Sequence, residues 1–576
     1  MEHAPHDGIG QGLSLVRLEQ LMDRMTRGWR GPLLAALVVV VAALPGLLFL
    51  PPLDRDESRF AQATTQMLET GDYVNIRYQD AARDKKPVGI HWLQAASVSL
   101  LTTPQARAIQ AYRVPSLLGA MLAAAACAWG AARVMGDRRG ALAGILLGAT
   151  FILSSEAFIA KTDAVLCGAV TLSMAALMQL YVAARRGEPM RRGLKLLFWL
   201  GQAVALIDKG PIGPMVAALT LLGLFILDRD LKWAAKLGWL WGLAIILLVV
   251  GPWAWAITVA TDGKFWGAAV GGDLAPKLRG GHEGHAAPPG LHVLLTPILF
   301  FPGAALLPLA LTTLWTRRDE VFVRFSACWL IPSWIVFEAT PTKLIHYTLP
   351  LYGALAWLAV AGLQKPMGRR VRWIGAGLSC LVGVVYAAIA LVGARTYGGG
   401  SDVAIAALAV VLALAAGVTG GVAVIYRGTQ GVRSAVALGC AVVVGAGLHM
   451  VMTGALAPSL QPLWPSRSAA QMVARQHLDP RDGVTEGPVV VAGFAEPSLV
   501  FQLGTSTDLG DAADAVDGLK DGQPALVESR QDKAFRALLR AQGVAASPVD
   551  SISGYNYSSG KPVALTLWRA PDDAAH

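Results

Sequence analysis

Long apolar runs recur between residues 33 and 456 and constrain the fold of this chain more than any other feature. A run of about 18 apolar residues or more can cross a hydrocarbon core of about 30 Å as a helix. The composition agrees, since 54% of the 576 residues are hydrophobic, 15% are charged and the mean hydropathy is +0.49. The sequence therefore predicts an all-α polytopic membrane domain of about 13 transmembrane helices. The predicted spans lie near 33–50, 112–133, 141–158, 164–184, 194–207, 211–227, 238–260, 290–314, 321–338, 347–363, 373–393, 403–426 and 434–455.

Clusters of arginine and lysine separate alternate spans and predict the orientation of the chain. Segments such as 17–30, 185–192 and 369–372 are rich in arginine, and positively charged loops stay in the cytoplasm. This places residues 1–32 in the cytoplasm, as a polar segment before a retained signal anchor. The formal net charge of +10 is thus a topology signal rather than a mark of nucleic-acid binding. The five cysteines all fall inside apolar runs, so no disulfide framework is predicted.

The same orientation places two polar segments on the outer face of the membrane. The first is the loop 51–111, inside a membrane domain predicted over 33–456. It contains an amphipathic stretch, 57–69, and a short apolar stretch, 89–101, predicted to be an interfacial or re-entrant helix. The second segment is 457–576, where β-like runs and an amphipathic helix near 531–542 predict a small α/β domain.

Carboxylates follow the first span directly, at Asp54, Asp56 and Glu57. A carboxylate near cations keeps a depressed pKa, which suits a general base that takes a proton from an attacking hydroxyl. The alternative is that these residues are the acidic first turn of an amphipathic helix. Asp163 has the same two interpretations at the start of the span 164–184.

Lysine and arginine also occur in the predicted outer loops, where the positive-inside rule does not expect them. Their presence there indicates an anionic ligand. Converging Lys and Arg side chains could bind a phosphate at the membrane surface, although contact with lipid headgroups or solvent would also account for single residues. Lys209 and Lys343 are the most suggestive, because they lie in very short loops against spans. These cations include Arg55, Arg59, Arg77, Arg83, Lys85, Lys86, Lys161, Lys209, Lys264, Lys277, Arg279 and Lys343.

The outer loop 261–289 carries His282, Glu283 and His285, and His292 follows shortly after. These residue types could bind a divalent metal. Their spacing is not the H-E-x-x-H of zinc hydrolases, and a Gly-rich loop often carries such residues without a metal.

A series of short motifs resembles one known family along nearly the whole chain. The motifs are D-E-S-R-F at 56–60, M-L-E-T-G-D-Y at 67–73, K-P-V-G-I-H-W at 86–92, K-T-D-A at 161–164, D-K-G-P at 208–211, G-P-W at 251–253, K-L-I-H-Y-T-L-P at 343–350 and E-P-S-L-V-F at 496–501. In this order they resemble the aminoarabinose-transferase and protein O-mannosyltransferase-like glycosyltransferases of the GT-C membrane class.

The resemblance implies an inverting enzyme that moves a sugar from a polyprenyl-phosphate carrier to a periplasmic acceptor such as lipid A, the lipopolysaccharide core or another glycan. It implies catalytic roles for Asp56, Glu57 and Asp163. It also implies donor-phosphate contacts by Arg59, Arg83, Lys86, Lys209 and Lys343, and a cavity lined by Lys85, His91, Trp92, His346 and Tyr347. A transporter or flippase of a lipid-linked sugar and a protein O-glycosyltransferase remain alternatives.

The chain departs from the family at Lys85, where the resemblance leads us to expect a glutamate before Lys-Pro. In the family that glutamate belongs with a histidine of the fourth outer loop in a metal site, and His285, near Glu283, is the matching histidine. No cofactor is therefore predicted with certainty, and a divalent metal stays a possibility. His91 likewise stands where a tyrosine is common, so the substrate cannot be carried over from the family.

Overall fold

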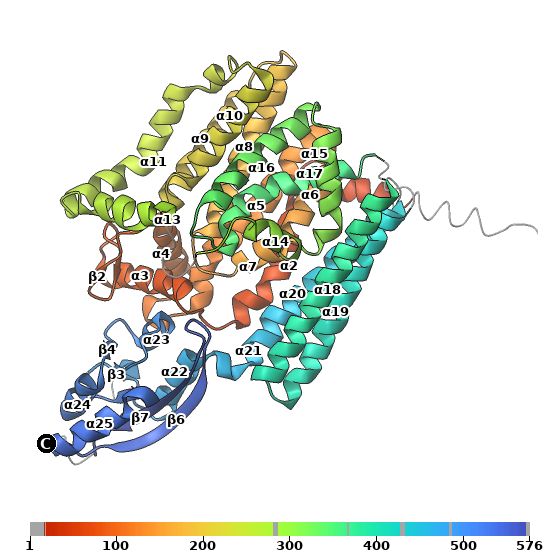
Figure 1. Ribbon diagram of the computed structural model, residues 1–576. Helices are drawn as coiled ribbons and strands as arrows, with labels where there is room; N and C mark the ends of the chain where they lie inside the picture. The colour runs from red at the N-terminus through yellow and green to blue at the C-terminus, as the bar shows by residue number, and fades with distance from the viewer. Residues whose placement is uncertain are drawn as a thin grey trace, which may run out of the picture.

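The fold consists of a bundle of membrane helices, an outer layer of short elements across one end, and a mixed α/β unit beyond that layer (Figure 1). The computed structural model describes residues 17, 19–279, 286–365, 368–426, 432–482 and 487–571. The outer layer and the α/β unit lie at the same end of the bundle.

Within the described residues, eight helices are each long and apolar enough to cross a membrane, which makes the chain a multi-pass membrane protein. Seven of them are α2 (Arg30–Phe49), α5 (Ile109–Met135), α8 (Asp163–Arg185), α11 (Trp239–Ala260), α16 (Val321–Ala339), α18 (Arg369–Tyr397) and α19 (Gly400–Ile425). The eighth runs from Ser434 to Ser459 and combines α20 (Val432–Val451), a π-helical turn (Met452–Leu456) and α21 (Ala457–Ser459).

The other predicted spans coincide with shorter or broken helices. The stretches predicted at 194–207 and 211–227 form α9 (Arg192–Lys209) and α10 (Ile212–Asp228). The stretch 141–158 divides into α6 (Asp137–Gly148) and α7 (Phe151–Glu156), and 290–314 divides into α14 (Leu291–Leu299), a 3-10 turn (Gly303–Leu306) and α15 (Leu307–Thr316). The stretch 347–363 opens as a 3-10 helix (Ile345–Leu351) and continues as α17 (Tyr352–Gly362). The breaks leave side chains of α7 and of the 3-10 helix 345–351 near the outer end of the bundle.

In a bilayer the hydrophobic effect gives no net attraction between helices, so close packing has to hold them together. Small residues allow that close packing here. A Cβ on Gly168 of α8 would lie 2.4 Å from the carbonyl oxygen of Gly119 on α5. A Cβ on Gly383 of α18 would lie 2.6 Å from the carbonyl oxygen of Ala413 on α19. Any larger residue at either glycine would therefore push the paired helices apart.

The outer layer is built from the loop after α2. It contains α3 (Asp56–Thr70), a small hairpin of β1 (Arg77–Tyr78) and β2 (Ala81–Ala82), and α4 (Gly89–Leu101). Both helices match the expectation of short helices in this loop. The layer is completed after α11 by α12 (Lys264–Trp266), a π-helical segment (Gly267–Leu274) and α13 (Ala275–Arg279). Figure 1 shows α3, α4 and α13 crossing the end of the bundle.

The C-terminal unit contains a five-stranded sheet in the order β4-β3-β5-β7-β6. Strand β3 is parallel to β4 and β5, whereas β7 is antiparallel to β5 and β6. Helices α22 and α23 cover one face, with Val491 in that core, and α24 and α25 cover the other, with Val490 and Ala492. The bounds are α22 (Pro465–Arg475), β3 (Val490–Ala492), α23 (Pro497–Leu503), β4 (Asp508–Gly510), α24 (Ala512–Lys520), β5 (Ala525–Glu528), α25 (Ser529–Gln542), β6 (Ser547–Asn556) and β7 (Lys561–Arg569).

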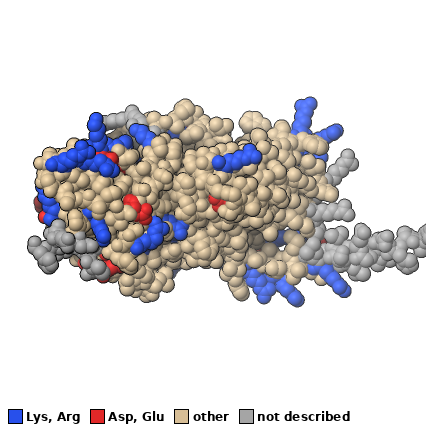
Figure 2. Space-filling model, turned by 90° about the horizontal axis from the view of Figure 1, so that it is seen from below, with Lys and Arg blue, Asp and Glu red and all other residues tan. Residues whose placement is uncertain are grey.

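Charged side chains are unevenly spread along the molecule. Figure 2 shows lysine and arginine side chains gathered toward the two ends of one face, with a mostly uncharged stretch between them. Exposed apolar residues such as Leu240, Trp241 and Leu248 lie on α11, consistent with contact to lipid.

Candidate active site

Asp56 is the first residue of α3 and lies half-buried at the outer end of the bundle. Burial acts to raise the pKa of its carboxyl group, but Lys86, Lys161 and Arg83 attract the ionised form more strongly. The result is a pKa lowered to about 2. Asp56 is therefore a carboxylate at any physiological pH, in a field of positive charge.

Two of those cations come from the loop between β2 and α4. The guanidinium carbon of Arg83 lies 4.3 Å from the centre of the Phe60 ring, and the Lys86 ammonium lies 5.0 Å from it. Phe60 is one helical turn after Asp56 on α3, so the ring holds both cations near that carboxylate. Burial lowers the pKa of Lys86 to about 8, with a further contribution from repulsion by Lys209 and opposition from Asp56.

A second group of charges surrounds Asp163, the first residue of α8. Its carboxylate accepts a hydrogen bond from the ammonium of Lys209. Lys161 Nζ and His346 Nε2 lie 3.6 and 3.5 Å from Asp163 Oδ2. Lys161 Nζ also lies 3.0 Å from Glu156 Oε1 on α7. These side chains are nearly buried, and they join α7, α8, α9 and the 3-10 helix 345–351 at one point.

The close approach of α4 to α9 brings the two groups of charges together. A Cβ on Gly89, the first residue of α4, would lie 2.6 Å from the carbonyl oxygen of Ile207 near the end of α9. The lack of a side chain at Gly89 therefore allows Lys86 to approach Lys209. The repulsion between the two ammonium groups helps to lower the pKa of Lys86. Lys209 Nζ lies 5.7 Å from the centre of the Tyr347 ring.

Glu57, predicted to act beside Asp56, is used elsewhere. Its carboxylate pairs with Arg113 of α5 at 2.8 Å, and both side chains are 0% exposed. The same carboxylate accepts hydrogen bonds from the backbone N–H groups of Leu53 and Ala160, each at 2.8 Å. Because its two oxygens are occupied in this way, the geometry favours a structural role for Glu57 over the predicted catalytic one.

Lys343, predicted to hold the donor phosphate, donates hydrogen bonds to the carbonyl oxygens of Thr340 and Ala287 at 2.7 and 3.0 Å. This nearly buried amine therefore ties the start of the segment before the 3-10 helix to the loop before α14. The geometry favours a backbone contact for Lys343 over the predicted phosphate contact.

Four other predicted residues lie around the charged groups in different settings. His91 is buried beneath Phe60, with ring centres 5.4 Å apart, and its Nδ1 lies 2.8 Å from Thr64 Oγ1. Trp92 is 37% exposed, and its indole N–H donates to the carbonyl oxygen of Tyr73 at 2.8 Å. Arg59 is half-buried on α3, and Lys85 is exposed.

The predicted metal ligands Glu283 and His285 lie outside the described residues. Within the part of the chain that the structure describes, no group of three or more His, Cys, Asp or Glu side chains could hold a metal. At position 85 the chain offers an ammonium, which cannot coordinate a cation. The described residues therefore do not fit the metal site implied by the resemblance, and no catalytic step is assigned to a metal.

The sequence analysis did not single out every charged residue at the site. Glu156 contacts Lys161, and Arg113 holds Glu57. Both lie inside stretches predicted to span the membrane, at 141–158 and 112–133. An ionisable residue within such a stretch is unusual, and that signal could have identified them.

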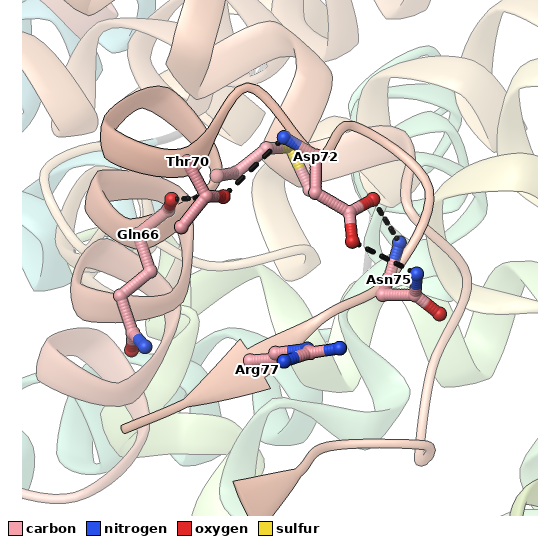
Figure 3. A pocket seen from close by; sticks show the side chains of 6 residues that line it. Gln66, Thr70, Asp72, Asn75 and Arg77 are labelled. Carbon is pink, nitrogen blue, oxygen red and sulfur yellow. Dashed lines mark hydrogen bonds between the residues drawn. The ribbon is translucent and has the colours of Figure 1, made fainter. Parts of the chain in front are cut away.

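A separate pocket lies at the far end of α3 from Asp56 (Figure 3). It is lined by residues that include Thr70, Asp72, Asn75 and Arg77. Asp72 accepts hydrogen bonds from the backbone and the side-chain amide of Asn75, at 3.0 and 2.8 Å. These contacts are internal to the turn after α3, so the pocket is a feature of that turn and not of the charged groups.

Comparison with solved structures identifies the fold. The structure of ArnT from Cupriavidus metallidurans bound to undecaprenyl phosphate superposes with a TM-score of 0.71, at 20% sequence identity, over 93% of this chain and 97% of that one. The chain therefore has the same fold as that protein. The apo structure of the same protein superposes with a TM-score of 0.70.

Sequence comparison agrees with this fold. Residues 85–255 match the family described as dolichyl-phosphate-mannose-protein mannosyltransferase. A relative from Pectobacterium carotovorum, named undecaprenyl phosphate-alpha-4-amino-4-deoxy-L-arabinose arabinosyl transferase, is 28% identical over 368 residues, which are 62% of this chain and 64% of that protein. The protein of the same name from Pseudomonas aeruginosa is 28% identical over 58% of this chain and 61% of its own length. The resemblance found in the motifs is therefore confirmed.

Proposed function

We propose that this protein is an inverting glycosyltransferase that moves a sugar from a polyprenyl-phosphate carrier to an acceptor in the cell envelope. The observation that carries the proposal is the arrangement of Asp56, an ionised carboxylate, against Lys86, Lys161 and Arg83 at the outer end of the bundle. An ionised base beside a group of cations suits a reaction in which a hydroxyl attacks and a phosphate leaves.

The cations would bind the donor through its phosphate. Lys86 and Lys209 are close enough to repel each other, and a bound phosphate placed between them would relieve that repulsion. The same phosphate would offset the positive field around Asp56. We therefore expect the pKa of Asp56 to rise from about 2 when the donor binds, which makes it a stronger base only in the loaded enzyme.

The reaction then follows from these positions. The acceptor hydroxyl attacks the anomeric carbon of the sugar, and Asp56 takes the hydroxyl proton as the new C–O bond forms. The bond between the anomeric carbon and the phosphate oxygen breaks, and its electron pair leaves with the polyprenyl phosphate. Lys86, Lys209 and Arg83 neutralise the negative charge on that leaving group. A single direct displacement inverts the anomeric centre.

Asp163 and Glu156 would act by holding the lysines. Lys161 and Lys209 both contact Asp163, and Lys161 also contacts Glu156. Ion pairs of this kind fix long, flexible side chains before the substrate arrives. Asp163 is thus proposed as a positioning residue for the phosphate-binding cations, with His346 and Tyr347 beside them.

The location and substrates are proposed on the same basis. The bacterial relatives favour a bacterial inner membrane, and the arginine-rich segments favour a site on the face opposite to the cytoplasm, which is the periplasmic face. We propose three parts, residues 1–32 in the cytoplasm, 33–456 as the catalytic membrane domain and 457–576 as a periplasmic domain. The names of the relatives favour an undecaprenyl-phosphate donor, and lipid A or another envelope glycan is the proposed acceptor.

Transfer of label from a polyprenyl-phosphate sugar to extracted envelope lipids tests the proposal. Purified protein in lipid nanodiscs should form a labelled product, and Asp56→Asn should form far less. Asp80→Asn is the matched control, because Asp80 is an exposed carboxylate in the same loop, on the turn between β1 and β2. Absence of product from the wild-type protein, together with movement of the labelled lipid across the bilayer, would favour a flippase instead.

A further inference from the structure

The two residues before Asp56 are held by the C-terminal unit. The backbone N–H of Asp54 donates a hydrogen bond to the hydroxyl oxygen of Tyr557 at 2.7 Å, and the Asp54 carboxylate accepts one from Ser498. The guanidinium of Arg55 donates to the carbonyl oxygen of Ser558 at 2.8 Å. Residues about 500 positions apart in the chain therefore meet directly beside the proposed base.

The backbone at Arg55 is strained. Its φ of 62° and ψ of −106° lie in a region that residues with a side chain rarely adopt. Such a conformation is unfavourable and persists only where the surrounding structure holds it. The contacts of Arg55 and Asp54 with residues 498, 557 and 558 are the surroundings that hold it here.

The turn that makes these contacts is well braced. It joins β6 and β7, which pair over a long antiparallel ladder. The side-chain oxygen of Asn556 accepts hydrogen bonds from the backbone N–H groups of Ser558 and Ser559, and its amide donates to Glu496 at 2.8 Å. The ring of Tyr557 packs edge-on against Trp464, with centres 5.9 Å apart. The turn can therefore act as a rigid part.

The C-terminal unit is also fixed to the other side of α3. Arg107, which is nearly buried, donates hydrogen bonds to Gln62 and Glu69 of α3 and to the carbonyl oxygen of Phe501 in α23. These bonds dock α23 against α3 (Figure 1). The docking sets the position from which the turn reaches Asp54 and Arg55.

We propose that the turn between β6 and β7 is a clamp that positions Asp56. By holding Asp54 and Arg55 in a strained conformation, Tyr557 and the carbonyl group of Ser558 fix the backbone that presents the Asp56 carboxylate to the acceptor. The inference deepens the proposed function and rests on it. It assigns the C-terminal unit a part in catalysis without any contact to the donor phosphate.

The clamp predicts a specific kinetic signature. Tyr557→Phe keeps the ring against Trp464 but removes the oxygen that accepts the Asp54 hydrogen bond. We expect kcat to fall by about tenfold, because misplacing a base weakens the transition state. KM for the labelled polyprenyl-phosphate sugar should change by less than about twofold, because the cations that bind phosphate lie on other segments. The Tm should stay within about 2 °C of wild type.

Arg55 supplies a second test with its own rescue. Arg55→Ala should lower kcat in the same way, and Arg55→Lys should recover part of it, because an ammonium can still donate to the Ser558 carbonyl oxygen. Arg540→Ala is the matched control, because Arg540 is exposed on α25 outside these contacts, and its kcat should equal that of wild type.

The possible outcomes separate the two proposals. A wild-type protein without transfer activity overturns the proposed function itself. An active wild type whose Tyr557→Phe and Arg55→Ala variants match it in kcat overturns the clamp alone. The clamp is also overturned if kcat falls only in variants whose Tm falls in parallel and Arg55→Lys restores no activity. Such a result would report lost stability alone.

Discussion

The charged groups around Asp56 and Asp163 and the pair of Glu57 with Arg113 lie at the same end of the bundle, yet they use their charges differently. In the first region several cations and several carboxylates lie together, and Lys86 has its pKa lowered to about 8. In the second region one carboxylate meets one guanidinium, and every hydrogen bond is made inside the protein. The first region is where we propose that the donor phosphate binds, whereas the carboxylate oxygens of the second are already occupied by hydrogen bonds from the protein.

Adjacent positions on one helix produce this contrast. Asp56 and Glu57 follow each other at the start of α3, and successive helical residues point about 100° apart. One residue thus faces the cations and the other faces α5. Two neighbouring carboxylates of one motif thus have different surroundings according to which face of the helix each occupies, and we propose a catalytic role only for Asp56.

Breaking the Glu57–Arg113 pair should have the largest effect on the folded state. Arg113→Met leaves a buried carboxylate without its partner and removes donors to the carbonyl oxygens of Gly46, Leu47, Leu50 and Pro51. We expect a loss of about 3–5 kcal/mol in stability. Thermal unfolding in detergent would measure it. Arg318→Met, at an exposed arginine on the opposite side of the bundle, is the control, and equal stability of the two variants would contradict a structural role for the pair.

Asp56→Asn should do the reverse, with a large effect on activity and almost none on stability. The amide cannot take a proton, so kcat should fall on the order of 10²- to 10⁴-fold while Tm stays near that of wild type. The ratio of initial transfer rates at saturating donor measures this. If Glu57→Gln kept its stability and lost as much activity as Asp56→Asn, the separation of roles between the two carboxylates would be wrong.

Lys209 and Lys343 should differ in their effect on donor binding. Lys209→Gln removes a cation next to Lys86, and we expect KM for the donor to rise roughly 10- to 100-fold, as for a charge-assisted contact of about 1.5–3 kcal/mol. Lys343→Gln should leave the donor KM almost unchanged, because the Lys343 amine contacts backbone carbonyl oxygens instead. Equal effects of the two variants would restore the role predicted for Lys343 from the sequence.

The smallest expected effect is a pH dependence set by Lys86. Because burial lowers the pKa of Lys86 to about 8, its positive charge is present below pH 8 and is lost as the pH rises through that value. We expect kcat/KM for the donor, which reports the free enzyme, to fall by up to about tenfold per pH unit above 8. Lys86→Arg should keep its charge and move this decline to higher pH. A wild-type profile that stays flat to pH 10 would contradict the pKa.

Much of the architecture followed from sequence patterns because the membrane imposes simple rules. Each predicted span coincides with helical residues, and both predicted short helices of the first outer loop are present as α3 and α4. The breaks between α6 and α7 and around residues 300–306 were not predicted, because apolar composition continues through them. The docking of α23 on α3 also left no periodic signal, since Arg107 reaches partners almost 400 residues away.

The predicted site residues fall into two groups, those that the structure brings together and those that bind other partners. Asp56, Lys86, Asp163 and Lys209 were predicted as site residues, and the structure brings them together. Glu57 and Lys343 had equally suggestive positions, but hydrogen bonds to Arg113 and to backbone carbonyl oxygens use them elsewhere. Sequence position indicates that a charge lies near the membrane surface and does not indicate the direction of its side chain.

By itself, the sequence determined that this protein is a multi-pass membrane protein with charged outer loops and a separate C-terminal segment, because hydrophobicity and charge act locally along a chain in a bilayer. Only the tertiary structure decided which charges meet. Because Gly89 has no Cβ, α4 packs closely on α9 and Lys86 lies near Lys209. The turn between β6 and β7 contacts Asp54 and Arg55 from the other end of the chain. Such meetings depend on packing between distant segments, which no local pattern records.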